Sequence, residues 1–120
     1  MNDVTAMSTP ATTSAAKLRA LLAEPGVITM PCCGDAFGAK LIEQAGFPVA
    51  FMSGFAASVL RIGQPDAGLM SYAEARDQGR DICAAVSIPV MGDGDTGWGN
   101  AINVRRTVKG FAQAGFASIM

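Results

Sequence analysis

Short apolar runs alternate with longer amphipathic stretches along most of the chain. We predict buried strands at four apolar runs, residues 27–30, 49–52, 88–91 and 116–120. We predict helices at five further stretches, residues 17–23, 36–45, 55–62, 72–86 and 101–114. Strands that alternate with helices indicate an α/β protein with a parallel sheet. The pattern alone fits both a doubly wound open sheet and a (β/α)8 barrel.

The two ends of the chain bear on the domain organisation. Residues 1–16 are rich in Thr and Ser without periodicity, and we predict a flexible lead there. The chain stops at Met120, inside the apolar run 116–120, which would leave an unpaired strand edge. A (β/α)8 barrel needs about 250 residues. We therefore expect residues 17–120 to form the N-terminal half of such a barrel, covering roughly its first four strands.

Helix boundaries and faces can be predicted at two places. Asp35 is a good cap for the helix that follows it. In the last helix, the spacing predicts four core-facing residues, Val104, Val108, Phe111 and Ala112.

Composition narrows the chemistry. The chain has 120 residues, half of them hydrophobic, and a net charge of -1, which predicts a globular core and no field for nucleic acid or an anionic membrane. No apolar run approaches the roughly 20 residues that span a bilayer. An odd count of three cysteines fits a reducing cytoplasm. The absence of histidine excludes His-ligated zinc and Ser-His-Asp or Cys-His catalysis within this chain.

The glycine-rich segment 92–100 holds the strongest candidate for chemistry. Asp93 and Asp95 lie two residues apart just after a predicted strand, and such close carboxylates repel each other unless a cation lies beside them. Oxygen ligands without histidine favour Mg²⁺ or Mn²⁺. The alternative is a Gly/Asp turn that caps the next helix. A calcium-binding EF-hand loop is excluded because its twelfth position holds Val104, not Glu.

Other candidates have a structural alternative of equal or greater weight. Ser53 and the backbone N–H groups after it lie at a strand end and form either an anion site or a simple helix cap. Asp66 follows a proline in a loop, which usually indicates a turn. Cys32 and Cys33 lack a histidine and the CxxC spacing, so we interpret them as small residues at a strand end. Four acids on predicted helix faces are expected to be solvated, Glu43, Glu74, Asp77 and Asp81.

Four segments taken in order resemble the isocitrate lyase/phosphoenolpyruvate mutase superfamily. They are LRALLAEPGVITMPCCGDAFGAKLIEQAGF, FMSGFAAS, GQPDAGL and IPVMGDGDTGWGNAINVRRTVKGFAQAGFA. The most similar branch contains 2-methylisocitrate lyase, 2,3-dimethylmalate lyase, oxaloacetate decarboxylase-like enzymes and carboxyphosphonoenolpyruvate mutase. Gly94 departs from the Ala of many members. The resemblance implies a (β/α)8 barrel, usually assembled as a homotetramer.

The resemblance also implies roles for particular residues. Asp93 resembles the direct ligand of Mg²⁺ or Mn²⁺, and Asp95 and Asp66 resemble carboxylates that hold metal-bound waters. The segment Ser53, Gly54 and Phe55 resembles the part that binds the substrate carboxylate. The catalytic acid or base of the family, commonly a Cys on a mobile loop, would lie beyond Met120 and is not assigned to Cys32 or Cys33.

The expected activity is that of a Mg²⁺-dependent carbon–carbon lyase acting on a small 2-hydroxy or 2-oxo carboxylic acid through a pyruvate-type enolate. A phosphonopyruvate or carboxyphosphonoenolpyruvate mutase-like or hydrolase-like activity is the alternative within the family. A catalytically inactive truncated product, prone to oligomerise through exposed apolar edges, is the alternative outside it.

Overall fold

The sheet contains four parallel strands in chain order. The structure is a computed structural model that describes residues 12–120. The strands are β1 (Cys32–Cys33), β2 (Ala50–Met52), β3 (Val90–Gly92) and β4 (Ser118–Ile119), in the order β1-β2-β3-β4. Phe51 of β2 pairs with Cys32 on one side and Met91 on the other. The prediction of a parallel α/β arrangement is confirmed.

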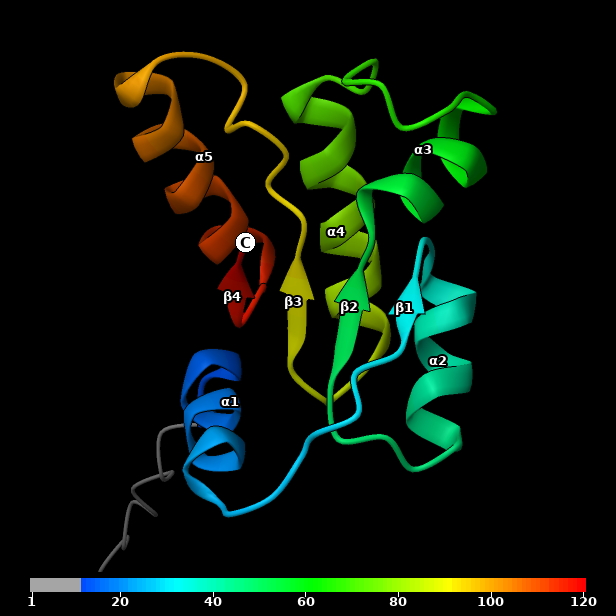
Figure 1. The fold of residues 1–120 in the computed structure, drawn as a ribbon, viewed down its shortest axis with the longest axis vertical. Coiled ribbons are helices and arrows are strands. Elements are labelled where there is room, and N and C mark those ends of the chain that lie inside the picture. Colours follow the sequence, from blue (N-terminus) through cyan, green and yellow to red (C-terminus); the bar gives the residue numbers. More distant parts are fainter. Residues whose placement is uncertain (1–11) are drawn as a thin grey trace, which may run out of the picture.

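Residues 12–120 form five helices, α1 (Ser14–Ala23), α2 (Ala36–Gln44), α3 (Gly54–Ile62), α4 (Tyr72–Ala85) and α5 (Ala101–Ala114). Figure 1 shows α2 and α4 along one face of the sheet, with α5 beside β4 and α3 at the ends to which the strand arrows point. Helix α1 lies near the opposite ends of the strands, where the Lys17 ammonium donates a hydrogen bond to the Ser87 carbonyl (2.9 Å). The carboxyl ends of the strands therefore lie on the same side of the sheet as α3 and its neighbouring loops.

Polar caps set where the helices begin. Asp35 caps α2 as predicted, because its carboxylate accepts a hydrogen bond from the Gly38 N–H (2.7 Å). Asn100 caps α5, whose predicted bounds are confirmed. Helix α1 begins earlier than predicted, because the Thr13 hydroxyl accepts from the Ala16 N–H. The predicted flexible lead 1–16 is thus wrong for 14–16, and residues 1–11 lie outside the described part.

The first strand begins later than the apolar pattern predicts. Residues 27–30 are not a strand, and Val27 is 97% exposed. Pairing starts where the Pro31 carbonyl accepts a hydrogen bond from the Phe51 N–H (3.0 Å), so that Cys32 is the first strand residue. The other predicted strands overlap the observed ones with shifts of one or two residues. An apolar run marks a strand but does not fix where its hydrogen-bonded ladder begins.

The core is formed by the sheet together with helices α2, α3, α4 and α5. Its largest fully buried side chains are Phe111, Met52, Ile82, Val49 and Val90. The Phe116 ring, just before β4, stacks on Phe111 with centroids 4.8 Å apart. A side chain at Gly79 or Gly92 would collide with that ring, so the absence of a side chain at both positions leaves room for Phe116.

The buried face of α5 differs from the predicted one. Phe111 is buried as expected, but Val104 and Val108 are 38% and 45% exposed, and Ala112 is exposed too. Thr107 and Gly110 are buried in their place. The Tyr72 hydroxyl of α4 occupies the space beside Gly110, and the Thr107 hydroxyl donates to the Gly97 carbonyl (2.9 Å). These two contacts set the rotation of α5. In residues 12–120, no helix has the length and apolar character that crossing a membrane requires.

Candidate active site at the carboxyl ends of the strands

Asp93 is held by two backbone N–H groups, one at the start of α3 and one in its own loop. It follows β3 directly, and its Oδ2 accepts a hydrogen bond from the Gly54 N–H at the start of α3 (3.1 Å). Its Oδ1 accepts from the Asp95 N–H (2.9 Å). Hydrogen bonds to a carboxylate are stronger than those between neutral groups. The Asp93 side chain is therefore fixed before any ligand arrives.

Asp66 faces the same point from another loop. A side-chain carbon on Gly54 would lie 2.8 Å from Asp93 Oδ2 and 3.4 Å from Asp66 Oδ2. The two carboxylates thus approach each other across the bare face of Gly54. The loop that carries Asp66 is anchored by Ser58, which is 3% exposed and whose hydroxyl lies 3.0 Å from the Gln64 carbonyl.

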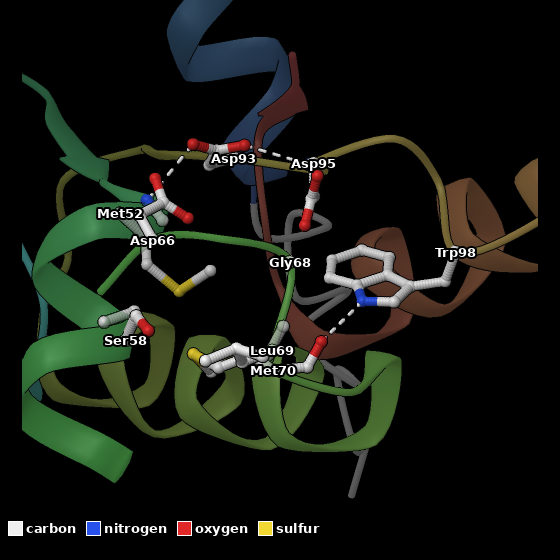
Figure 2. A pocket seen from close by; sticks show the side chains of 12 residues that line it. Met52, Ser58, Asp66, Gly68, Leu69, Met70, Asp93, Asp95 and Trp98 are labelled. Atoms are coloured by element: carbon white, nitrogen blue, oxygen red, sulfur yellow. Dashed lines mark hydrogen bonds between the residues drawn. The ribbon is translucent and has the colours of Figure 1, made fainter. Parts of the chain in front are cut away.

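Asp95 completes the acidic side of a cavity of about 170 Å³. Its backbone lies in the left-handed region (φ 49°), an uncommon conformation for a residue other than glycine. Figure 2 shows the three carboxylates along one side of the cavity and the Trp98 indole on another. The remaining wall is mainly apolar, formed by Met52, Ala57, Leu69, Met70 and Ala75. The structure therefore gathers the three predicted metal-site residues at one cavity.

Only one residue of the predicted carboxylate-binding segment lines the cavity. Gly54 lines the cavity, whereas Ser53 and Phe55 do not, and Phe55 is 61% exposed. The Ser53 hydroxyl caps α3 by accepting from the Ala56 N–H (3.4 Å), as the structural alternative predicted. The Gly54 N–H is already used by Asp93.

None of the three cysteines lines this cavity. Burial, followed by the charges of Asp35 and Cys32, raises the pKa of the Cys33 thiol to about 11. Burial also raises the pKa of Cys83 to about 12. Both thiols are protonated at neutral pH, which agrees with a structural role.

The sequence alone did not single out Trp98 or Ser58 for this site. The Trp98 Nε1–H donates a hydrogen bond to the Met70 carbonyl (2.9 Å), which links the loop after β3 to the loop before α4. The only available signal was a bulky aromatic residue set between Gly97 and Gly99. Ser58 looks like any other small residue of a helix, and nothing in the sequence marks it.

The match to known proteins decides the family. The family model described as phosphoenolpyruvate phosphomutase matches residues 18–120. This chain belongs to the isocitrate lyase/phosphoenolpyruvate mutase superfamily. The chain is 45% identical over 98 residues to carboxyvinyl-carboxyphosphonate phosphorylmutase of Arabidopsis thaliana, covering 81% of this chain and 29% of that protein. It is 42% identical to 2,3-dimethylmalate lyase of Eubacterium barkeri, covering 88% and 37%.

Solved structures of the superfamily show the same fold. A phosphonopyruvate hydrolase in complex with oxalate and Mg²⁺ is similar with a TM-score of 0.84 and 38% identity, covering 89% of this chain and 38% of that one. The superfamily fold is a (β/α)8 barrel, and the four strands of this chain correspond to part of it. The chain spans about a third of the length of these relatives.

The donor set of this superfamily member can be compared with what Mg²⁺ requires. Among residues 12–120, no three His, Cys, Asp or Glu side chains are arranged as a complete ligand group. Mg²⁺ is usually bound by one or two carboxylates and keeps several waters. Three carboxylates around one cavity, those of Asp93, Asp66 and Asp95, without a complete ligand cage among the described residues, are compatible with that pattern. These residues therefore fit a water-rich Mg²⁺ or Mn²⁺ site.

Proposed function

We propose that this chain carries the cation- and acid-binding part of a Mg²⁺- or Mn²⁺-dependent carbon–carbon lyase. Its substrate would be a small 2-hydroxy or 2-oxo carboxylic acid that is cleaved through a pyruvate-type enolate. The observation that carries the proposal is the fixed Asp93 carboxylate, which faces Asp66 across Gly54 at the strand ends. Ligands of parallel α/β folds bind at this end of the strands.

Each carboxylate has a separate task in this proposal. Asp93 is the direct ligand, because two backbone N–H groups already hold both of its oxygens in place. Asp66 and Asp95 accept hydrogen bonds from the waters that the cation keeps. The cation, when bound, supplies the positive charge that stabilises the oxygen anion developing as the carbon–carbon bond breaks. Protein groups held in position need no reorganisation at that moment.

The start of α3 is the proposed contact for the substrate carboxylate. A helix N-terminus presents free N–H groups and a positive dipole end to an anion. In the first turn of α3, Asp93 uses the Gly54 N–H and Ser53 uses the Ala56 N–H. The Phe55 N–H, next to the cavity-lining Gly54 although Phe55 itself does not line the cavity, is the proposed donor to the substrate carboxylate. We assign no general acid or base within residues 12–120.

A mutase or hydrolase acting on a phosphonate-type acid is the second candidate. It is favoured by the names of two similar proteins, a carboxyvinyl-carboxyphosphonate phosphorylmutase and a phosphonopyruvate hydrolase. Both candidate reactions would place negative charge on an oxygen beside the same carboxylates. The difference lies in the bond that breaks, so the products distinguish the two candidates.

The decisive experiment combines binding with product analysis. We expect calorimetry to show that Mg²⁺ or Mn²⁺ is required for oxalate, a mimic of pyruvate enolate, to bind. Asp93→Asn should remove that binding, whereas Asp81→Asn, at an exposed acid of α4, should leave it unchanged. Binding that survives in Asp93→Asn would contradict the metal assignment. A panel of C4 to C7 acids, assayed for 2-oxo acid release and for phosphate release, separates lyase from hydrolase.

We also propose that the protein associates with itself. Large apolar side chains on α2 and α3 are exposed, among them Phe37 (70%), Leu41 (50%) and Leu60 (58%), and exposed apolar patches favour association. Light scattering coupled to size exclusion should give a mass above that of one chain, and a monomer across a tenfold concentration range would contradict this. The three free thiols support a reducing compartment such as the cytoplasm.

A further inference from the structure

Trp98 links the two loops that carry the acidic residues. It belongs to the loop between β3 and α5, and its indole forms one wall of the cavity, facing Leu69 and Met70 (Figure 2). The Nε1–H donates to the Met70 carbonyl at 2.9 Å, and Met70 is only 8% exposed. The hydrogen bond is partly buried, and a carbonyl that loses its donor away from water is costly.

The backbone at Trp98 is strained, which indicates that its contacts hold it there. Its φ is 56°, in the left-handed region that bulky residues rarely occupy, between Gly97 (82°) and Gly99 (142°). The ring packs at 5.9 Å between centroids against both Tyr72 and Phe111. Strain that persists because the surroundings impose it is typical of functional sites.

The loop that carries Asp66 is anchored on both sides of that residue. On one side, the Ser58 hydroxyl contacts the carbonyls of Gln64 (3.0 Å) and Pro65 (3.2 Å). On the other side, Trp98 holds the Met70 carbonyl. Residues 66–69 between the anchors are exposed. The position of Asp66 therefore depends on the two anchors and not on burial of its own segment.

We propose that Trp98 is a positioning residue that holds the 63–70 loop so that Asp66 faces Asp93 across Gly54. The proposal rests on the cation-binding role of the two carboxylates proposed above. Trp98 would act through Asp66, because its hydrogen bond ends on the loop and not on Asp93. Replacing the indole by a ring without an N–H should release the loop while the sheet stays intact.

Hydrogen exchange on the metal-free chain tests the first half of this proposal. In Trp98→Phe, we expect the Ala67 amide of this loop, which donates to the Pro65 carbonyl (2.9 Å), to exchange about fivefold to tenfold faster, the factor expected when one hydrogen bond is lost, while α4 and α5 keep their protection. The matched control is Tyr72→Phe, which changes the same aromatic cluster without touching the Met70 carbonyl. Equal exchange in wild type and Trp98→Phe would overturn the proposal.

A second measurement covers the case in which Trp98→Phe does not fold. Trp98 is the only tryptophan of the chain, so the wild type gives a single indole N–H signal in NMR spectra. A hydrogen bond to Met70 predicts that this proton exchanges at least tenfold more slowly than that of a free indole. Exchange at the free rate would overturn the proposal.

A double-mutant cycle on Mn²⁺ affinity tests the second half. We expect Trp98→Phe and Asp66→Asn each to weaken Mn²⁺ binding severalfold, and the double variant to be no weaker than Asp66→Asn alone. Additive losses would show that Trp98 does not act through Asp66 and would overturn this half. If the wild type binds no Mn²⁺, the proposed function fails, and the exchange experiment still decides whether Trp98 holds the loop.

Discussion

Gly54→Ala adds one carbon beside Asp93 and should change both the stability of the fold and its affinity for a cation. It is the first residue of α3, and its N–H donates to Asp93 Oδ2 at 3.1 Å. The β-carbon of Gly54→Ala would lie 2.8 Å from the same oxygen and 3.2 Å from Asp93 Cγ, below the 3.4 Å at which ordinary contacts begin. The carboxylate has to retreat, and the hydrogen bond has to lengthen or break.

Two opposing effects set the size of the stability change. A hydrogen bond to a charged acceptor contributes about 1.5–3 kcal/mol to stability. Alanine stabilises a helix by up to about 1 kcal/mol relative to glycine. We therefore expect Gly54→Ala to lower the free energy of unfolding by about 0.5–2 kcal/mol. For a domain of this size, that loss lowers Tm by several degrees. Cation binding should weaken by at least tenfold, or about 1.4 kcal/mol or more, because Asp93 and Asp66 both lose their positions.

Thermal unfolding and Mn²⁺ titration measure these two effects in one preparation. The matched control is Gly38→Ala in α2, whose added carbon meets Asp35 Oδ1 at 3.2 Å and Cys33 Cβ at 3.3 Å, away from the acidic cavity. That control should change Tm without changing Mn²⁺ affinity. If Gly54→Ala binds Mn²⁺ as tightly as the wild type does, the close approach at Gly54 is not what positions Asp93.

Three further predictions concern stability and thiol chemistry. Phe111→Ala should lower the free energy of unfolding by about 3–5 kcal/mol, measured by urea titration, because the ring is 1% exposed; a loss below 1 kcal/mol would contradict this. Hydrogen bonds from Ser87 lower the pKa of Glu43 below its usual 4.5. The stabilisation by ionised Glu43 is therefore complete above about pH 4.5 and is lost as the pH falls through the folded-state pKa, so Tm falls with it. In Glu43→Gln, Tm should fall less over the same pH range. At pH 8 an aromatic disulfide reagent should modify one thiol rapidly, that of exposed Cys32, because burial raises the pKa of the other two to about 11 and about 12. Rapid reaction in Cys32→Ser would refute this.

The elements could be predicted from sequence where local chemistry fixes them. Helix α5 has its predicted bounds because Asn100 accepts hydrogen bonds from the first turn and Gly115 takes the left-handed conformation (φ 107°) that ends it. Strand β1 could not be placed, because its start depends on which carbonyl meets the Phe51 N–H across the sheet. The face of α5 was mispredicted at Val104 for a similar reason, because contacts from other elements set the helix rotation.

The site residues, too, could be predicted only where the local sequence marks them. Asp93 and Asp95 stand out locally, since two acids among glycines follow an apolar run. Asp66 resembles an ordinary turn residue, and its importance depends on a loop that folds back to Gly54. Glu43, expected to be a solvated surface charge, accepts hydrogen bonds from the Ser87 N–H (2.8 Å) and hydroxyl (2.6 Å). Partners 44 residues apart leave no mark on a local pattern.

The core and the cavity are joined by one series of aromatic rings. Phe116 stacks on Phe111, Phe111 packs against Trp98, and the Trp98 N–H reaches the carbonyl of Met70. Packing density in a core lets a change at one ring shift the next. Phe111→Ala should therefore loosen the 63–70 loop as well as the core, whereas Trp98→Phe should loosen the loop and leave the Phe111–Phe116 stack protected. The asymmetry arises because Trp98 lies at the end of the series, where the core gives way to the acidic cavity.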